Sequence, residues 1–187
     1  MQIVGRRVVL RDEIQETDYE DFFRWHNLEE WNYYDEPDAP FKAMTREAFE
    51  SWRKRPKKTV SASHSWQIDT IDGKHVGWVD YYQLDEKAGC AYVGIDLPQP
   101  ETWGQGFGTE AVRLVVDYLF RQMELQSVKT KTWTGNKRMR QVAEKVGFKE
   151  IVRSPHRAQF SIRGEPLEFV EYAIPKVEWL SDSNVNT

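Results

Sequence analysis

This sequence of 187 residues contains very little cysteine, because Cys90 is the only one. A single thiol cannot close a disulfide within the chain, and it cannot supply the several thiolates of a cysteine-based zinc site. The length is sufficient for a hydrophobic core that needs no cross-links. We therefore expect a cytoplasmic protein without a bound metal.

The chain also lacks a long hydrophobic run and an excess of basic charge. No stretch approaches the roughly 20 apolar residues of a membrane span, and residues 1–10 lack the apolar centre of a signal peptide. Lysine and arginine total 26 against 30 aspartate and glutamate residues, a formal net charge of −4. The basic run of residues 53–58 is typical of a solvated helix end. We expect neither a membrane partner nor a nucleic-acid partner, since proteins that bind phosphate backbones usually carry a basic excess.

Aromatic residues, by contrast, are abundant, at 13% of the chain with eight tryptophans. Such rings pack in cores and line ligand pockets. Together with a hydrophobic fraction of 40%, they predict a packed globular protein. We expect one domain over residues 1–180, followed by a frayed tail over residues 181–187.

Hydrophobic periodicity predicts an α+β protein with a mixed, mostly antiparallel central sheet flanked by helices. Strands are predicted over residues 7–11, 64–71, 75–82, 91–97, 127–133, 148–153 and 167–174. Helices are predicted over residues 17–27, 45–53, 109–123 and 136–146.

Local signals refine these elements. Thr17 and Glu20 form a capping-box pattern, and Thr45 is a candidate cap of the second helix. An Asp72-Gly73 pair between two β-rich runs predicts a hairpin turn. The segment of residues 28–41 contains two prolines and many aromatic and acidic side chains, so it predicts an irregular loop.

Three glycines alternate before the strong third helix, in the segment Trp103-Gly104-Gln105-Gly106-Phe107-Gly108-Thr109. Missing side chains let the backbone approach an anion, and the N–H groups and dipole of a helix N-terminus attract it. The segment contains neither the Lys-Ser/Thr pair of a Walker loop nor the spacing of a dinucleotide fingerprint. It indicates a pyrophosphate-binding turn, with a flexible turn before a well-capped helix as the alternative.

A second motif follows later in the chain. Asn136 begins the helix of residues 136–146, and that helix closes with Glu144-Lys145-Val146-Gly147-Phe148. Over residues 76–174 the two motifs together resemble the acetyl-coenzyme A motifs of the GCN5-related N-acetyltransferases, the GNAT family. Within that family the chain is most similar to the branch of ribosomal-protein N-terminal acetyltransferases and aminoglycoside 6'-N-acetyltransferases.

The resemblance implies a GNAT fold and an enzyme that transfers an acetyl group from acetyl-coenzyme A to a primary amine by direct attack in a ternary complex. The backbone of the glycine turn would hold the pyrophosphate, and a strand end and a helix start would contact the pantetheine arm. The cofactor-binding residues so implied are Ile95, Leu97, Gln105, Gly106, Phe107, Gly108, Thr109 and Asn136. An ordinary helix cap is the alternative role of Asn136.

Asp96 is the candidate catalytic residue. In the strand of residues 91–97 it shares a face with Tyr92 and Gly94, close to where the resemblance places the thioester. The aminoglycoside enzymes carry a similar Ile-Asp pair in that strand. Asp96 would take a proton from the acceptor amine, and a carboxylate that only pairs with a cation or caps the following turn is the alternative.

The resemblance places the acceptor at the segment between the first two helices, which here combines carboxylates with aromatic rings. That composition suits a cation through charge and cation–π attraction. A polyamine, an aminoglycoside or a basic peptide N-terminus would fit, and an acidic surface loop whose rings plug the core is the alternative. The candidate substrate-binding residues are Trp31, Tyr33, Tyr34 and Asp35.

Two other functions remain open on the sequence. One is a non-catalytic coenzyme A-binding module of the same fold, and the other is a nucleotide-binding protein that uses the same glycine turn. The sequence also leaves a homodimer open.

Overall fold

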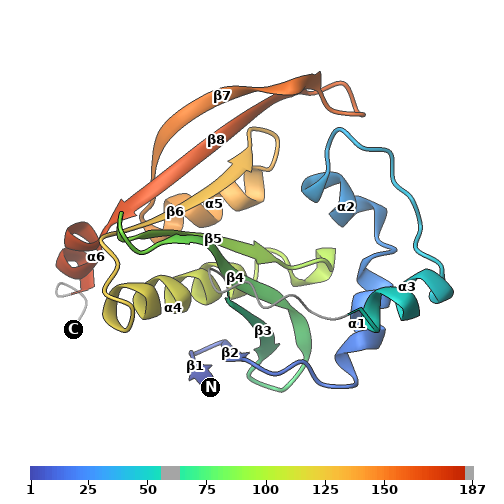
Figure 1. Ribbon diagram of the computed structural model, residues 1–187, viewed down its shortest axis with the longest axis horizontal. Coiled ribbons are helices and arrows are strands. Elements are labelled where there is room, and N and C mark those ends of the chain that lie inside the picture. Colours follow the sequence, from blue (N-terminus) through green and yellow to red (C-terminus); the bar gives the residue numbers. More distant parts are fainter. Residues whose placement is uncertain (56–63, 184–187) are drawn as a thin grey trace.

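The computed structural model describes residues 1–55 and 64–183, and its centre is one eight-stranded sheet (Figure 1). The strand order is β1-β2-β3-β4-β5-β6-β8-β7. All neighbouring strands are antiparallel except β5 and β6, which are parallel. The strands are β1 Gln2–Val4, β2 Val8–Arg11, β3 His64–Thr70, β4 His75–Asp85, β5 Cys90–Asp96, β6 Ser127–Trp133, β7 Lys149–Phe160 and β8 Pro166–Pro175.

Helices flank this sheet, so the predicted fold class, a mixed and mostly antiparallel sheet with flanking helices, is confirmed. The helices are α1 Asp18–Trp25, α2 Glu29–Asp35, α3 Arg46–Arg53, α4 Phe107–Arg121, α5 Lys137–Val146 and α6 Lys176–Ser183, with a 3-10 turn η1 Pro100–Thr102. Within the described ranges, no helix is both long enough and apolar enough to cross a bilayer.

The main core lies between the sheet and α4. Val112, Val115 and Val116 belong to the apolar stripe that the sequence predicted, and all three are fully buried. They pack in one cluster with strand residues such as Ile68 and Val79. This burial fixes α4, and therefore its N-terminal glycine turn, relative to the central strands.

A smaller aromatic core holds α1 and α3. Phe22, Trp25 and Phe49 form it, and Trp78 of β4 packs against them. Because Val79 belongs to the main core and side chains alternate along a strand, Trp78 lies on the opposite face of β4. The two cores therefore cover opposite faces of this strand.

Of the two helix caps predicted from the sequence, the structure contains one. Thr45 Oγ1 accepts a hydrogen bond from the Ala48 N–H at 3.2 Å, which confirms the cap of α3. Thr17 makes no side-chain cap bond, so the predicted capping box at α1 is wrong. Its φ of −63° and ψ of −28° are helical, whereas a capping residue needs an extended backbone to reach the N–H groups ahead.

The predicted irregular loop over residues 28–41 is also partly wrong, because α2 forms within it. Trp31 and Tyr33 on this helix are 8% and 4% exposed. Burial of these two rings outweighs the weak helix propensity of the segment, which tertiary context commonly overrides.

Other boundaries differ more modestly. The Asp72-Gly73 hairpin is confirmed, with Gly73 at a φ of +85°, while β1 was not predicted and β7 extends to Phe160. Helix α6 includes residues 181–183, which the sequence assigned to a frayed tail, and residues 184–187 lie outside the described ones. Half of the basic run, residues 56–58, also lies outside them.

Candidate active site

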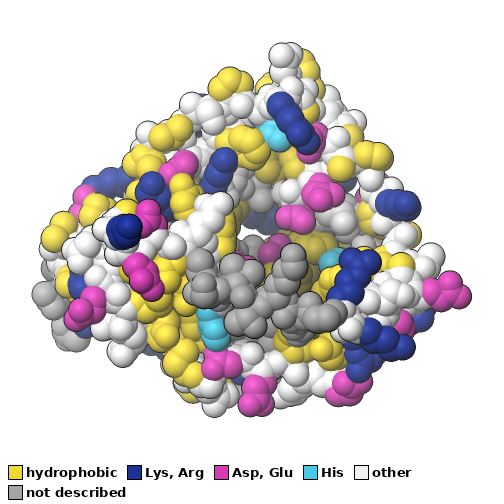
Figure 2. Space-filling model, viewed as in Figure 1, with side chains coloured by type: hydrophobic (Ala, Val, Ile, Leu, Met, Phe, Trp, Pro, Cys, Tyr) yellow, Lys and Arg dark blue, Asp and Glu magenta, His cyan; other side chains and the backbone are white. Residues whose placement is uncertain are grey.

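A cavity of about 650 Å³ lies at the end of β5, between α2, α4 and α5. Figure 2 shows a hollow in this face of the molecule, with acidic side chains beside it. Acidic lining residues come from two places, the α2 segment with Asp35, Glu36 and Asp38, and the sheet with Asp80 and Asp96. The cavity is large enough for a drug-sized ligand.

The cavity exists because β5 and β6 separate. The two strands pair only where residues 90–92 face residues 127–129. Further along, Thr130 Oγ1 still donates to the Val93 carbonyl at 2.8 Å, but residues 94–96 have no partner in β6. Unpaired backbone groups at this edge are available to an extended ligand that makes strand-like hydrogen bonds.

One backbone group at this edge, the Leu97 carbonyl, already accepts a hydrogen bond within the protein. The Trp103 indole N–H donates to the Leu97 carbonyl at 2.6 Å. Leu97 and Ile95 still line the cavity. The Leu97 carbonyl oxygen, which has two lone pairs, therefore already accepts one hydrogen bond within the protein.

The glycine turn forms the next wall. Gly106 is the N-cap of α4 with a φ of +86°, a left-handed conformation that glycine adopts without strain. A Cβ at Gly108 would lie 3.3 Å from Leu97 Cδ1 and 3.5 Å from Ile95 Cδ1, so glycine lets α4 begin close against β5. No side chain caps the helix, so its first N–H groups can bind an anion at the cavity wall.

Helix α5 supplies the wall opposite. Asn136 Oδ1 accepts a hydrogen bond from the Met139 N–H at 3.1 Å, so Asn136 is a helix cap as well as a cavity residue. Arg138 lies with its guanidinium carbon 3.5 Å from the ring centre of Trp103 and 4.1 Å from that of Tyr34. One of its buried nitrogens has no hydrogen-bond partner, which leaves a donor for an anionic ligand.

Asp96 lines the cavity and is partly buried, and its Oδ1 accepts a hydrogen bond from Trp31 Nε1 at 3.0 Å. Burial and the negative charge of Asp35 raise the pKa of Asp96 to about 7; the Trp31 hydrogen bond opposes this shift and the charge of Asp80 adds to it. A carboxyl group that titrates near neutral pH is well suited to accept a proton from an amine.

Two cavity residues on β4, Asp80 and Tyr82, were missed by sequence reasoning. Burial raises the pKa of Asp80. Burial and the charges of Asp80 and Asp96 raise the pKa of Tyr82 to about 12, so its hydroxyl stays protonated. The sequence does place Asp80 and Tyr82 two residues apart in a predicted strand, and therefore on one face of it. It does not show which residues of β5 lie opposite them.

Most of the residues predicted from the sequence do border this cavity. Those that line it are Trp31, Tyr34, Asp35, Ile95, Asp96, Leu97, Gly106, Phe107, Gly108, Thr109 and Asn136. Tyr33 instead packs with Trp133 and Leu167, and its hydroxyl donates to Glu165. The Gln105 side chain donates to the Glu101 carbonyl and is not part of the described lining.

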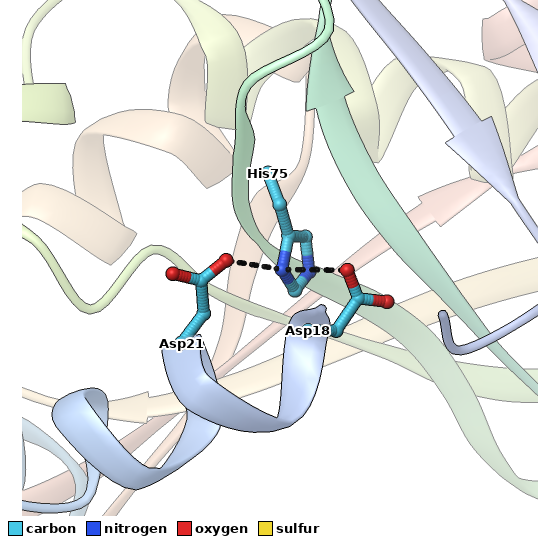
Figure 3. Close-up of side chains that lie close together, drawn as sticks. All are labelled: Asp18, Asp21 and His75. Carbon is cyan, nitrogen blue, oxygen red and sulfur yellow. Dashed lines mark hydrogen bonds and ion pairs between the residues drawn. The ribbon is translucent and has the colours of Figure 1, made fainter. Parts of the chain in front are cut away.

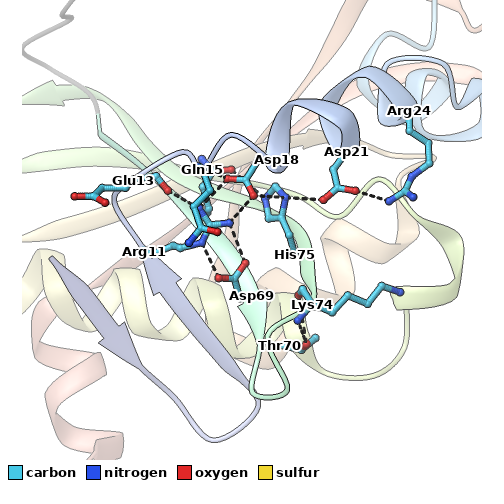
Figure 4. Close-up of polar contacts among 11 residues, drawn as sticks. Arg11, Glu13, Gln15, Asp18, Asp21, Arg24, Asp69, Thr70, Lys74 and His75 are labelled. Atoms are coloured by element: carbon cyan, nitrogen blue, oxygen red, sulfur yellow. Dashed lines mark hydrogen bonds and ion pairs between the residues drawn. The ribbon is translucent and has the colours of Figure 1, made fainter.

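A second group of titratable residues lies outside the cavity. His75 Nδ1 is 3.3 Å from a carboxylate oxygen of Asp18 and 3.1 Å from one of Asp21 (Figure 3). Arg11 donates to both oxygens of Asp18 at 2.8 Å, and Arg24 pairs with Asp21 at 2.6 Å (Figure 4). These cations compensate the carboxylates, so we interpret the group as an ionic network that ties α1 to β2 and β4.

Comparison with known proteins supports the assignment of the fold and the motifs. Residues 7–149 match the profile of the acetyltransferase (GNAT) domain family. The chain belongs to the GNAT family. The resemblance drawn from the glycine turn and the Asn136 helix is therefore confirmed.

Two relatives of this GNAT protein come from Bacillus subtilis (strain 168). YdaF, provisionally named a ribosomal N-acetyltransferase, is 31% identical over 108 residues, 58% of this chain and 57% of its own. YoaA, an uncharacterized N-acetyltransferase, is 30% identical over 113 residues, 59% of this chain and 62% of its own. The chain thus matches somewhat more than half the length of these relatives.

Solved structures resemble this GNAT protein over nearly its whole length. A spermidine N-acetyltransferase from Vibrio cholerae, in complex with CoA and spermine, has a TM-score of 0.74 at 18% identity and covers 94% of this chain and 99% of its own. A GNAT-family acetyltransferase from Bacillus anthracis has a TM-score of 0.72 at 18% identity, and the match covers 95% of this chain and 99% of its own. At this identity the likeness establishes the fold.

Proposed function

We propose that this protein is an N-acetyltransferase that transfers the acetyl group of acetyl-coenzyme A to a cationic primary amine. One observation carries the proposal. A single cavity joins the glycine turn of α4, the unpaired edge of β5 and the Asp96 carboxylate, so an anion site and a base share one space. Family membership supports this reaction.

One side of the cavity favours anions and another side favours cations. The N-terminus of α4 and the guanidinium of Arg138 favour the phosphates of coenzyme A. The unpaired edge of β5 suits the amide groups of pantetheine. Asp35, Glu36 and Asp38 on the α2 side favour an ammonium group, and the rings of Trp31 and Tyr34 add apolar contact.

Acetyl-coenzyme A, when bound, supplies the acetyl thioester. Asp96 accepts a proton from the ammonium group of the acceptor, which gives the neutral amine that can attack. The amine nitrogen then forms a bond to the acetyl carbon while the carbon–sulfur bond breaks, and the thiolate leaves and is protonated. No covalent bond to the protein is required, which agrees with the position of Cys90 at the opposite end of β5 from Asp96.

The direct test is an assay of thiol release from acetyl-coenzyme A with a panel of amines: spermidine, an aminoglycoside and a peptide with a basic N-terminal segment. We expect release that requires both the thioester and one of these amines. Tight binding of acetyl-coenzyme A without release for any amine would favour a non-catalytic coenzyme A-binding module. Thermal stabilisation by ATP and not by acetyl-coenzyme A would overturn the proposal.

The role of Asp96 has its own test in the variant Asp96→Asn, which keeps the shape and removes the basic site. We expect kcat to fall by roughly 10²- to 10⁴-fold, the usual contribution of a placed general base. Affinity for acetyl-coenzyme A stays the same, and a higher pH restores part of the rate because more of the amine is already neutral. A wild-type kcat in this variant would exclude Asp96 as the base.

A further inference from the structure

The register between β4 and β5 brings a second carboxylate onto the same face as Asp96. Asp80 lies directly opposite Gly94, and Asp96 is two residues further along β5. Residues that face one another across an antiparallel pair, and those two positions further along, point to the same side of a sheet. Asp80 and Asp96 are therefore diagonal neighbours on one face, and both line the cavity.

Gly94 lets the Asp80 carboxylate and the Tyr82 ring lie close over β5. A Cβ built at Gly94 would lie 2.7 Å from Oδ1 of Asp80, so any larger residue would displace this carboxylate. The Asp80 carboxylate thus lies over the backbone of β5, on the side where Asp96 projects. With glycine at this position, nothing from β5 separates the two carboxylates.

Within the part of the chain that the structure describes, neither carboxylate has a cationic partner. Among the ion pairs of residues 1–55 and 64–183, none includes Asp80 or Asp96. By contrast, the buried carboxylate of Asp18 on α1 is paired with Arg11 of β2. Two partly buried carboxylates without a cation are costly unless a ligand supplies the positive charge.

We propose that Asp80 and Asp96 together bind the ammonium group of the acceptor, with Asp80 as a substrate-binding residue of the transfer reaction. The inference rests on the proposed function and adds a residue to it. The fit is reasonable, because Cβ atoms of diagonal neighbours are about 7 Å apart and an ammonium nitrogen bonds carboxylate oxygens at about 2.8 Å. One ammonium group can therefore contact both side chains.

This arrangement gives the two carboxylates different tasks. Asp96 takes the proton, whereas Asp80 keeps its negative charge beside the nitrogen, which becomes positive again as the new carbon–nitrogen bond forms. The preferred acceptor is a primary alkyl amine that enters as an ammonium ion, and a neutral arylamine of similar size lacks the charge that both carboxylates select.

The test is Asp80→Asn in the full chain, with steady-state kinetics on the best amine of the panel. We expect the KM for the amine to rise at least tenfold, while the Kd for acetyl-coenzyme A stays within about twofold of wild type. The matched control is Asp85→Asn, the same change on the same strand, at a turn where the carboxylate accepts from the Lys87 and Ala88 N–H groups. In this control the KM for the amine and the Kd for acetyl-coenzyme A should both stay unchanged.

A pH profile separates binding from a structural role. The groups that face Asp96 are Asp35 and Trp31 from α2 and Asp80 and Tyr82 from β4. Removal of the Asp80 charge lowers the pKa of Asp96, so the acid limb of kcat/KM should move to lower pH in Asp80→Asn. A variant that was merely less stable would not move this limb.

A second variant guards against an ambiguous result. Gly94→Ala leaves every charge in place but displaces the Asp80 carboxylate, and it should also raise the KM for the amine.

An unchanged amine KM in Asp80→Asn, with thiol release intact, would overturn this inference alone. A loss of acetyl-coenzyme A binding in Asp80→Asn would overturn it too, by assigning Asp80 to the cofactor. Absence of thiol release in the wild-type protein would instead overturn the proposed function.

Discussion

Trp31 and Asp96 are joined by a hydrogen bond from the indole N–H to the carboxylate, 3.0 Å long, between α2 and the end of β5. The Trp31 ring also meets the Trp78 ring edge-on, with centroids 5.7 Å apart. Trp31 therefore links the acidic α2 segment of the cavity lining to the proposed base. A change in the position of α2 changes the environment of Asp96 as well.

Trp31→Phe tests this link through the pH profile. Burial and the charge of Asp35 raise the pKa of Asp96, and the Trp31 hydrogen bond works against them by stabilising the carboxylate. Its loss raises the pKa further, above the present value of about 7. Because a base acts only when deprotonated, the acid limb of kcat/KM should move to higher pH, and an unmoved limb would show that the bond has no influence on Asp96.

Gly106→Asp tests the anion site at α4. A carboxylate at the N-cap, next to the proposed pyrophosphate position, should reduce affinity for acetyl-coenzyme A at least tenfold through charge repulsion. The matched control is Gly164→Asp, since Gly164 has a similar φ of +78° against +86° for Gly106 but lies in the β7–β8 turn. Calorimetry on both folded variants separates backbone strain, which they share, from loss of the site.

Asn136 has two candidate roles, a helix cap and a contact to pantetheine, and two variants distinguish them. Asn136→Ala should cost about 1 kcal/mol of unfolding free energy, the usual value of a cap. It should also weaken acetyl-coenzyme A binding by about 1 kcal/mol, as when a hydrogen-bond partner is lost. Asn136→Ser keeps a capping oxygen and should restore stability but not affinity. Recovery of both would leave the cap as the only role.

Asp18→Asn tests the ionic network below α1. The Asp18 side chain is 2% exposed and that of Arg11 is 10% exposed, so removal of the Asp18 charge leaves the buried guanidinium with one carboxylate partner, Asp69, instead of two. We expect a loss of about 2 kcal/mol in denaturant unfolding, the usual value of a hydrogen bond to a charged group, with unchanged affinity for acetyl-coenzyme A. The control Glu150→Gln breaks an exposed pair with Arg153 and should leave stability unchanged. Equal stability of both variants with wild type would contradict the structural role.

Local chemistry explains what the sequence predicted. The stripe of α4, the Asp72-Gly73 turn, the Thr45 cap and the glycine stop of α5 each depend on residues within a few positions of one another. The glycine turn and Asn136 belong to this group, because a helix start is specified by its own first residues. The anion-binding turn was accessible from the sequence for that reason, whereas the roles of Ile95, Leu97 and Asn136 toward pantetheine were implied by the resemblance to the GNAT family.

Long-range packing decided the rest. Helix α2 forms because Trp31 and Tyr33 become buried against elements far away in the chain. At the start of α1, Thr17 makes no cap bond, and the next residue, Asp18, binds Arg11 of β2. No local pattern contains these partners. The same limit applies to the placement of Tyr33, whose hydroxyl binds Glu165 of the β7–β8 turn instead of facing the cavity.

Asp80 gives the clearest example of this division. The sequence by itself determined that β4 and β5 are strands and that their side chains alternate. The pairing of Asp85 with Cys90 next to the turn, continued without interruption, would place Asp80 opposite Ile95 and on the other face from Asp96. A bulge between Tyr82 and Asp85, where Gln83 has a φ of +52°, inserts one residue into β4 and brings Asp80 opposite Gly94. A shift of one residue reverses which face every side chain occupies, so only the tertiary structure placed the two carboxylates together.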